Sequence, residues 1–326
     1  MLLNTTGKVV VLFALSLSST LNGVTQTTSS NVPATTLSQA VQPVTLAITV
    51  INKRGNFVTG LQRDNFRIAI DKNPAEIIDF REDDAPLSVG IIFDASGSVG
   101  NPQSPKTAFK STQQALASFL EASNQANEYF LMAFNNKPQL LLDWTSDAKA
   151  IIEVLGGLQP KGKTAFYDAC YLAINKVQHG RYSKRVLILI SDGEDNLSTY
   201  TFNQVRDELK ASGVLVYSVN FSRADDAGSV LGMEGQEFLK ELSLLSGGMS
   251  FYQEYGGSVA KKATSIFELF AQELRHQYTI AITPRVSSDN KKWHRIKIKV
   301  QPAPHASGEM KQLSARTREG FYLNHR

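Results

Sequence analysis

Polar side chains follow three apolar runs of the sequence. The stretch IIFDASGSVGN carries Asp94, Ser96 and Ser98 directly after strand-forming residues. Thr164 precedes a helical stretch in GKTAFYDA, and Asp192 follows the apolar run VLILIS. All five side chains are hard oxygen donors, which suit Mg²⁺, and also Mn²⁺ or Ca²⁺, rather than zinc. If the three loops converge, the sequence predicts a divalent-cation site.

The elements around these residues predict how the loops meet. Between residues 87 and 276, apolar strand candidates alternate with amphipathic helical stretches. The runs VGIIF and VLILI are apolar on both faces, as buried parallel strands must be. We therefore predict an α/β fold with a doubly wound, mostly parallel, Rossmann-like sheet. In such a sheet, ligands bind at the carboxyl ends of the central strands.

Two flanking segments, 43–86 and 277–326, have a different periodicity. In HRIKIKV the apolar residues Ile296, Ile298 and Val300 alternate with lysines, and VTLAITV shows the same alternation. A period of two is typical of antiparallel strands with one buried face. We predict one small antiparallel β module, with an N-terminal half at 43–86 and a C-terminal half at 277–326, flanking an α/β domain at 87–276.

The first 23 residues have the pattern of an export signal. Lys8 precedes the run VVVLFALSLSS, which is shorter than the roughly 20 apolar residues of a membrane span. We predict a signal peptide at 1–23, a Ser/Thr-rich flexible linker at 24–42, and a secreted or periplasmic mature chain without a membrane span. An uncleaved signal anchor is the alternative.

Composition excludes several classes of protein. The 326 residues are 42% hydrophobic and 20% charged, as in a soluble globular protein. A net charge of +4 is too small and too dispersed to indicate a nucleic-acid partner. The single cysteine, Cys170, lies among helix-spaced apolar residues, so we expect a buried core side chain and no zinc cluster.

Taken together, the motifs resemble the metal-ion-dependent adhesion site (MIDAS) of von Willebrand factor type A (VWFA) domains. Asp94, Ser96, Ser98, Thr164 and Asp192 match all five positions of that site, and the resemblance covers roughly residues 87–276. It implies that the two serines are direct metal ligands and that the threonine is a ligand in at least one state. The two aspartates would act mainly through bound water. The flanks, with LAITVINKRGNFVTGLQRDNFRI and YTIAITP, resemble a bacterial group of exported VWFA proteins.

The resemblance also implies an adhesion-type function. With mostly neutral direct ligands, a divalent cation keeps positive charge and can accept an exposed Asp or Glu of a partner protein. Two alternatives remain: a metal-dependent hydrolase, and a non-catalytic assembly or scaffold subunit with an unoccupied site. A hydrolase needs a base in reach or carboxylates for a second metal, and we find neither in the sequence. We therefore expect no enzyme activity.

Further expectations concern charged residues, histidines, one loop and the last helix of the domain. We interpret Glu194 and Asp195 as solvated loop charges. All five histidines lie outside the three loops, and we expect surface or β-module positions for them. The segment 222–238 is polar and contains glycines, so we predict a loop that borders the metal face. The last helix of the domain, near 258–276, runs directly into a strand that begins at Tyr278.

Overall fold

The structure is a computed structural model that describes most of the chain after residue 41. The described residues all fall within one compact unit, Val41–Arg326, and are 42–97, 99, 105–222, 229–254, 259–284, 292–302 and 308–323. The predicted signal peptide, almost all of the predicted linker and Ser98 lie outside these residues.

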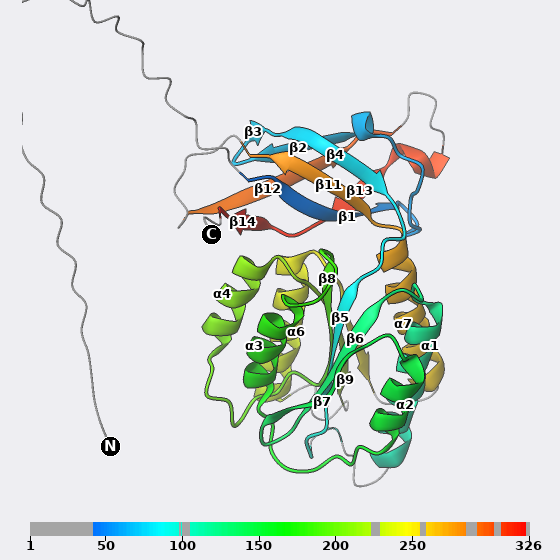
Figure 1. Ribbon diagram of the computed structural model, residues 1–326, viewed down its shortest axis with the longest axis vertical. Helices are drawn as coiled ribbons and strands as arrows, with labels where there is room; N and C mark the ends of the chain where they lie inside the picture. Colours follow the sequence, from blue (N-terminus) through cyan, green and yellow to red (C-terminus); the bar gives the residue numbers. More distant parts are fainter. Residues whose placement is uncertain are drawn as a thin grey trace, which may run out of the picture. The chain divides into compact units, whose positions relative to one another are not determined.

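A six-stranded sheet forms the centre of the α/β domain (Figure 1). Its order is β10-β9-β8-β5-β6-β7, and only β7 pairs with its neighbour in an antiparallel manner. Every residue of β5 and β6 is buried, which explains why these strands are apolar on both faces. The predicted fold class is confirmed. The strands are β5 (Ser88–Asp94), β6 (Glu128–Phe134), β7 (Pro138–Thr145), β8 (Arg185–Ile190), β9 (Leu215–Ser222) and β10 (Ser250–Glu254).

Helices cover both faces of this sheet. Buried side chains of α1, α2 and α7 share one apolar core with the sheet, and those of α3, α4 and α6 share the other. Cys170 belongs to the second core and is buried, as predicted. The helices are α1 (Pro105–Ala122), α2 (Ala148–Gly156), α3 (Phe166–Val177), α4 (Phe202–Ser212), α6 (Val230–Ser246) and α7 (Val259–Arg275). Within the described ranges, none of the helices has both the length and the apolar character needed to cross a bilayer.

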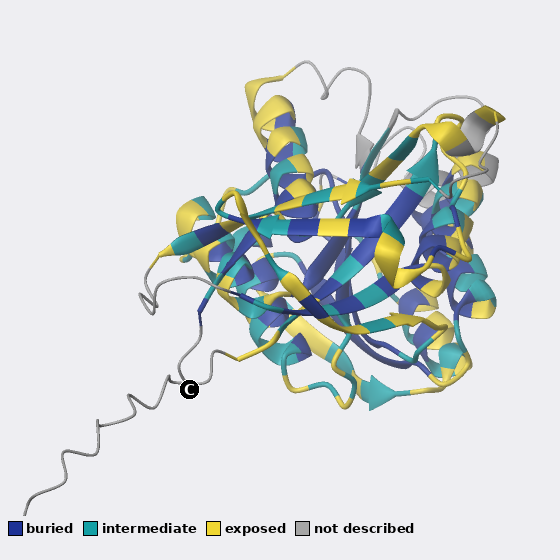
Figure 2. Ribbon diagram, turned by 90° about the horizontal axis from the view of Figure 1, so that it is seen from above, coloured by how far each residue is buried: buried dark blue, intermediate teal, exposed yellow. Residues whose placement is uncertain are grey.

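The flanking segments form two four-stranded antiparallel sheets, with orders β13-β1-β11-β4 and β14-β12-β2-β3. Both sheets contribute to one apolar core, and buried and exposed residues alternate along several strands (Figure 2). Strands from the two ends of the chain pair directly, β1 and β4 with β11, and β2 with β12. The predicted β module is therefore a sandwich, called the β-sandwich below. Its strands are β1 (Val44–Asn52), β2 (Phe66–Ile70), β3 (Asn73–Pro74), β4 (Glu76–Glu82), β11 (Tyr278–Thr283), β12 (Trp293–Val300), β13 (Leu313–Arg316) and β14 (Gly320–Tyr322), with 3-10 turns η1 (Arg63–Asn65) and η2 (Gly308–Lys311).

A buried polar network joins α7 to the β-sandwich. The Glu273 carboxylate of α7 accepts hydrogen bonds from Thr49 Oγ1 of β1 at 2.7 Å and from the Tyr217 hydroxyl of β9 at 2.8 Å. It also pairs with Arg316 of β13. Gln277 donates to both the Thr49 and Tyr217 oxygens at 3.1 Å. Because Glu273 is fully buried, its charge depends on these partners.

The start of α6 corrects one prediction. We expected a loop over 222–238; residues 223–228 lie outside the described residues, but from Val230 on the chain is helical, in α6. The Ser229 side chain accepts a hydrogen bond from the Gly232 amide at 2.9 Å, so it caps the first turn. Glycines in this segment suggested a loop because glycine destabilises helix interiors. The cap and the packing of Gly235, described below, explain why a helix forms here.

Candidate metal centre

Four of the five predicted ligand residues lie at the carboxyl-terminal edge of the central sheet. Asp94 is the last residue of β5, Ser96 lies two residues after it, and Asp192 lies two residues after the end of β8. Thr164 lies just before α3. All four are buried, with at most 7% of any of them exposed, although they are polar. The fifth residue, Ser98, lies outside the described residues.

The Asp94 carboxylate is held in place through both of its oxygens. The Ser96 amide donates to Oδ1 at 2.8 Å, and the Ser191 hydroxyl donates to Oδ2 at 2.6 Å. Ser191 Oγ is itself fixed by the Gly193 amide at 3.0 Å. Sequence analysis did not identify Ser191, although it directly precedes Asp192 in LISDG. Its position shows that the loop after β8 supports the carboxylate at the end of β5.

Backbone hydrogen bonds join the loop after β5 to the loop before α3. The Lys161 amide donates to the Ala95 carbonyl at 2.9 Å, and the Gly97 amide donates to the Gly162 carbonyl at 3.0 Å. Because only main-chain groups form these two bonds, the side chains of both loops remain available as metal ligands.

The loop before α3 is joined in turn to the loop after β8. The Thr164 amide donates to Asn196 Oδ1 at 3.0 Å, and the Asn196 and Leu197 amides donate back to the Thr164 carbonyl at 3.0 and 3.1 Å. Within the loop after β8, the Glu194 amide donates to Asp192 Oδ1 at 3.1 Å. The three loops carrying the predicted ligands are thus hydrogen-bonded to one another.

Asp195 has a different position from the one predicted. We expected a solvated loop charge, but its Oδ1 accepts the Phe166 and Tyr167 amides of the first turn of α3, at 2.7 and 3.1 Å. The residue at the cap position, Ala165, has no side-chain oxygen for this purpose, so a carboxylate from another loop replaces it. A cap supplied from 29 residues away has no local sequence signal.

Two glycines allow α6 to pack directly on the Asp192 loop. Gly193 has φ of +82°, and a Cβ at this position would lie 2.3 Å from the Gly235 carbonyl oxygen. A Cβ on Gly235 would lie 2.6 Å from the Gly193 carbonyl carbon. Only hydrogen at both positions permits this contact, which explains a glycine inside a helix. The first half of α6 therefore borders the candidate site.

The electrostatics of the site favour a cation. The pKa of Asp94 is raised from 3.8 to about 7, chiefly by burial and also by the negative charge of Asp192. Hydrogen bonds from Ser191 and Ser96 lower this pKa but do not outweigh burial and repulsion. Two buried carboxylates that disfavour each other's ionisation are stabilised by a positive charge between or beside them.

The donor set fits a hard divalent cation. No cluster of three or more His, Cys, Asp or Glu side chains capable of holding a metal is present among the described residues. The candidate site instead combines carboxylate and hydroxyl oxygens, the ligand chemistry of Mg²⁺, Mn²⁺ and Ca²⁺. A cavity of about 20 Å³ adjoins Asp94 and Ser191, but most of its lining is apolar, and Ser96, Thr164 and Asp192 do not line it.

Comparison with known proteins identifies the domain. Residues 89–194, which include all five predicted ligands, match the family model of the von Willebrand factor type A domain. This chain contains a von Willebrand factor type A domain. The resemblance expected from its sequence is thereby confirmed, and no curated protein matches the chain.

Solved structures of VWFA and other proteins share parts of the fold at low identity. BatB, a conserved hypothetical protein from Bacteroides thetaiotaomicron, is 16% identical with a TM-score of 0.44, over 57% of this chain and 99% of that one. The vWF domain of the type V pili tip protein Mfa5 from Porphyromonas gingivalis is 15% identical with a TM-score of 0.46, over 59% and 95% of the two chains.

Proposed function

We propose that this protein is an exported, non-catalytic binding module that recruits an acidic side chain of a partner protein through a divalent cation. One observation carries this proposal: loops from three places in the chain, joined by hydrogen bonds, present buried oxygen donors at one edge of the VWFA sheet. The predicted signal segment supports the exported location.

Each residue of the site has a distinct role in this proposal. The hydroxyls of Ser96, Ser98 and Thr164 would be direct ligands, and Asp94 and Asp192 would orient coordinated water. Ser191 and the Ser96 amide hold the Asp94 carboxylate in one orientation before any ligand arrives. The cation, when bound, supplies an incompletely neutralised positive charge with a coordination position that a carboxylate can fill.

Exposed apolar residues beside the site support a protein as the partner. Val230, Leu231 and Met233 in the first turn of α6 are 68%, 52% and 52% exposed. They precede Gly235, the residue that packs on the Asp192 loop. Grouped apolar side chains on a soluble surface are typical of interaction sites. A partner could therefore place a carboxylate on the cation and apolar atoms on α6.

The positions of the described histidines agree with a non-catalytic role. His179 contacts the Asn175 carbonyl of its own helix at 3.0 Å. His294, in the β-sandwich, contacts Asp71 at 2.8 Å, and His276 lies near the Phe57 ring. None of these contacts involves the loops of the candidate site, so we propose no proton-transfer role for the three imidazoles.

Calorimetric titration with Mg²⁺ and Mn²⁺ tests the metal site. Ser96→Ala removes one hydroxyl ligand and its hydrogen bond to Asp94 and adds no volume, so we expect at least a 10 to 100-fold loss of metal affinity with a small fall in the melting temperature in EDTA. Ser314→Ala is the matched control, because Ser314 is exposed on β13 of the β-sandwich. Equal metal affinity in wild type and Ser96→Ala, or no binding at millimolar metal, would refute the site.

A pull-down from the native envelope or exoproteome tests the partner. We expect proteins that are retained with Mg²⁺, released by EDTA and absent when Ser96→Ala is the bait. Retention that is the same with and without EDTA would show that the partner binds independently of a cation.

A further inference from the structure

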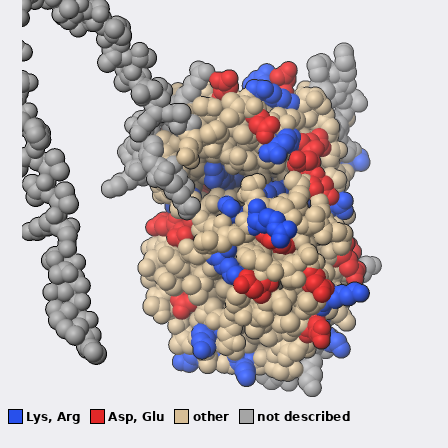
Figure 3. Space-filling view, in the orientation of Figure 1, with Lys and Arg blue, Asp and Glu red and all other residues tan. Residues whose placement is uncertain are grey.

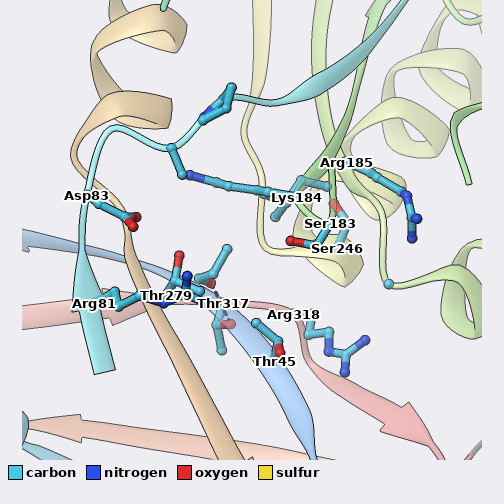
Figure 4. Close-up of a pocket in the computed structure, with 15 residues that line it drawn as sticks. Thr45, Arg81, Asp83, Ser183, Lys184, Arg185, Ser246, Thr279, Thr317 and Arg318 are labelled. Atoms are coloured by element: carbon cyan, nitrogen blue, oxygen red, sulfur yellow. Dashed lines mark hydrogen bonds between the residues drawn. The ribbon is translucent and has the colours of Figure 1, made fainter. Parts of the chain in front are cut away.

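A hollow of about 550 Å³ opens on the β-sandwich. The residues that line it come from η1, β2, β3, the start of β4 and β12. Among the described residues, it shares none of its lining with the loops of the candidate metal centre, or with the cavity of about 210 Å³ that Thr45, Lys184 and Arg318 line (Figure 4). Its volume is within the roughly 300–1,000 Å³ of pockets that bind ligands.

The lining of this hollow carries an excess of positive charge. Among the described residues it has five cations and one carboxylate, Asp64. In Figure 3, Lys and Arg atoms alternate with Asp and Glu atoms at the top of the molecule, over the β-sandwich, so an excess of one sign is not general there. None of the five cations forms an ion pair with a carboxylate in the part of the chain that the structure describes. The five are Arg63, Arg67, Lys72, Lys297 and Lys299.

Three of these cations project from the outer face of one sheet. The side chains of Ile68 in β2 and Ile298 in β12 belong to the apolar core of the β-sandwich, so those of the alternate residues face away from it. Lys297 and Lys299 are therefore on the same outer face, and both are exposed. Arg67 is directly opposite Lys299 in the register of the two strands and is also exposed. Paired residues have Cβ atoms about 5 Å apart, so the charges crowd one another.

This crowding is unfavourable without a ligand. Like charges directly opposite each other in an antiparallel pair are destabilising, and Lys299 and Arg67 are such a pair. The next row of the same face holds Lys297 opposite Ala69, with Pro74 beyond it, so it adds a third positive charge and no negative one. A face that gathers charge of one sign without neutralising it is complementary to a negatively charged partner.

Both arginines of the hollow are held by main-chain oxygens. Arg67 Nη1 donates to the Asp64 and Phe66 carbonyls at 2.9 and 3.1 Å, and Arg63 Nη2 donates to the Ile77 carbonyl. A neutral carbonyl orients a guanidinium without cancelling its charge. Because a guanidinium has five N–H donors, each arginine keeps donors for a carboxylate.

Strand β2 separates two unlike sides of the hollow. In the sheet, β2 lies between β12 and β3, so Lys297 and Lys299 are on one side of it. Pro74 and Ala75 are on the other side, where the Ala75 amide donates to the Ile68 carbonyl at 2.9 Å. One side of the hollow is thus cationic, and the other is mainly apolar.

We propose that this hollow binds an extended segment of a partner protein in which acidic and apolar residues alternate. Side chains of an extended chain point to opposite sides in turn, and every second side chain recurs after about 7 Å, which is also the spacing of Lys297 and Lys299 along β12. The carboxylates would then meet the lysines, and the apolar side chains would meet Pro74 and Ala75. A polyphosphate has no apolar group for that side, and a bilayer surface is too flat to enter a hollow.

This site is independent of the proposed metal-dependent function, because its residues belong to the β-sandwich and not to the three loops of the metal centre. An acidic peptide could also bind a cation at the metal centre, so the binding experiment is done in EDTA. Failure of this proposal then leaves the metal site untouched. Peptide binding that needs Mg²⁺ and disappears in Ser96→Ala would belong to the metal centre and would overturn the present proposal.

The test is a fluorescence-anisotropy titration of the purified protein with a labelled peptide of sequence GEVEVEG, at low and at raised ionic strength. We expect saturable binding that weakens as salt is added. The peptide GEEEVVG has the same composition without the alternation, and it should bind more weakly. Equal affinity for the two peptides, or tighter binding of polyphosphate or heparin at the same charge, overturns the assignment to an alternating segment.

Variants of the cationic side locate the binding. Exposed ion pairs change an affinity by up to about fivefold each, so we expect roughly a tenfold loss when Lys297→Gln and Lys299→Gln are combined, and a smaller loss in Arg67→Gln. Lys53→Gln is the matched control, because it removes the same charge from an exposed turn after β1, outside the hollow. An unchanged affinity in the combined variant overturns the proposal.

Chemical denaturation checks the charge crowding without any ligand. Lys299→Gln relieves the repulsion of Arg67, so the free energy of unfolding at low ionic strength should be unchanged or higher. A lower free energy of unfolding in this variant would show that the chain itself compensates the lysine, and it would overturn the argument for an external acidic partner.

Discussion

Metal binding at Asp94 should be strongly linked to pH. In the metal-free protein the pKa of Asp94 is raised from 3.8 to about 7, so a cation must displace a proton below that pH. About nine-tenths of the Asp94 carboxyls are ionised at pH 8, about one-tenth at pH 6 and about one-hundredth at pH 5. The apparent Mg²⁺ affinity should therefore fall about tenfold from pH 8 to pH 6 and about 100-fold from pH 8 to pH 5.

The same shift sets the pH dependence of stability in the absence of metal. Because the folded-state pKa lies above the ordinary value, protonated Asp94 stabilises the metal-free fold at low pH, and this contribution is lost as the pH rises from about 4 to about 7. At about 1.4 kcal/mol per pH unit, the loss is at most about 4 kcal/mol. Mg²⁺ should restore stability at pH 8 and have little effect at pH 5.

Two measurements check this reasoning. Calorimetry across pH 5 to 8 gives the metal affinity, and chemical denaturation in EDTA gives the free energy of unfolding at each pH. Asp94→Asn is neutral at every pH, so it should lack the Asp94-dependent part of both pH profiles. A wild-type Mg²⁺ affinity that is equal at pH 6 and pH 8, or an unchanged stability profile in Asp94→Asn, would contradict the argument.

Three further predictions concern the residues that support the site and the β-sandwich. Gly235→Ala should lower the free energy of unfolding by about 1–3 kcal/mol and weaken metal binding, because the added Cβ would overlap the Gly193 backbone. The measurement is chemical denaturation, with Gly156→Ala as the control because no atom lies within 4 Å of the Cβ it would add. Asp195→Ala should lower the free energy of unfolding by about 1 kcal/mol, because it removes the cap of α3. An unchanged free energy of unfolding in chemical denaturation would contradict the capping role. Glu273→Gln should lower the free energy of unfolding by about 3 kcal/mol, since it removes the carboxylate charge from the buried network. An unchanged denaturation midpoint would show that this charge contributes no stability.

Periodicity in the sequence was sufficient to predict the fold class. Strands such as β5 and β6 are buried on both faces and therefore apolar throughout, whereas sandwich strands such as β2 alternate. These patterns reflect local backbone geometry, which each segment carries by itself. The positions of Asp94 and Asp192 were also predictable, because these candidate ligands follow β5 and β8, whose carboxyl ends share one edge of the sheet.

Contacts between distant segments were not predictable in this way. Asp195 caps a helix that begins 29 residues earlier, and Ser191 donates to a carboxylate 97 residues away. Gly235 lies in a helix although its residue type argues against one, because the tertiary contact with Gly193 outweighs a helix propensity of about 1 kcal/mol. A cavity of about 210 Å³ likewise combines residues from β4, β8 and the segment after β13, whose proximity only the folded chain creates.

The pairing of β4 with β11 has a consequence for the order of folding. These strands are neighbours in one sheet, yet the whole VWFA domain lies between them in the chain. Pairing them from an unfolded chain would require closing a loop of roughly 200 residues, which costs entropy and slows folding. A VWFA domain that has already folded holds its two ends near each other and so shortens the effective loop. We therefore expect the β-sandwich to assemble last, after the segment that follows α7 has been made, with β1 and β4 lacking their partners β11 and β13 until then.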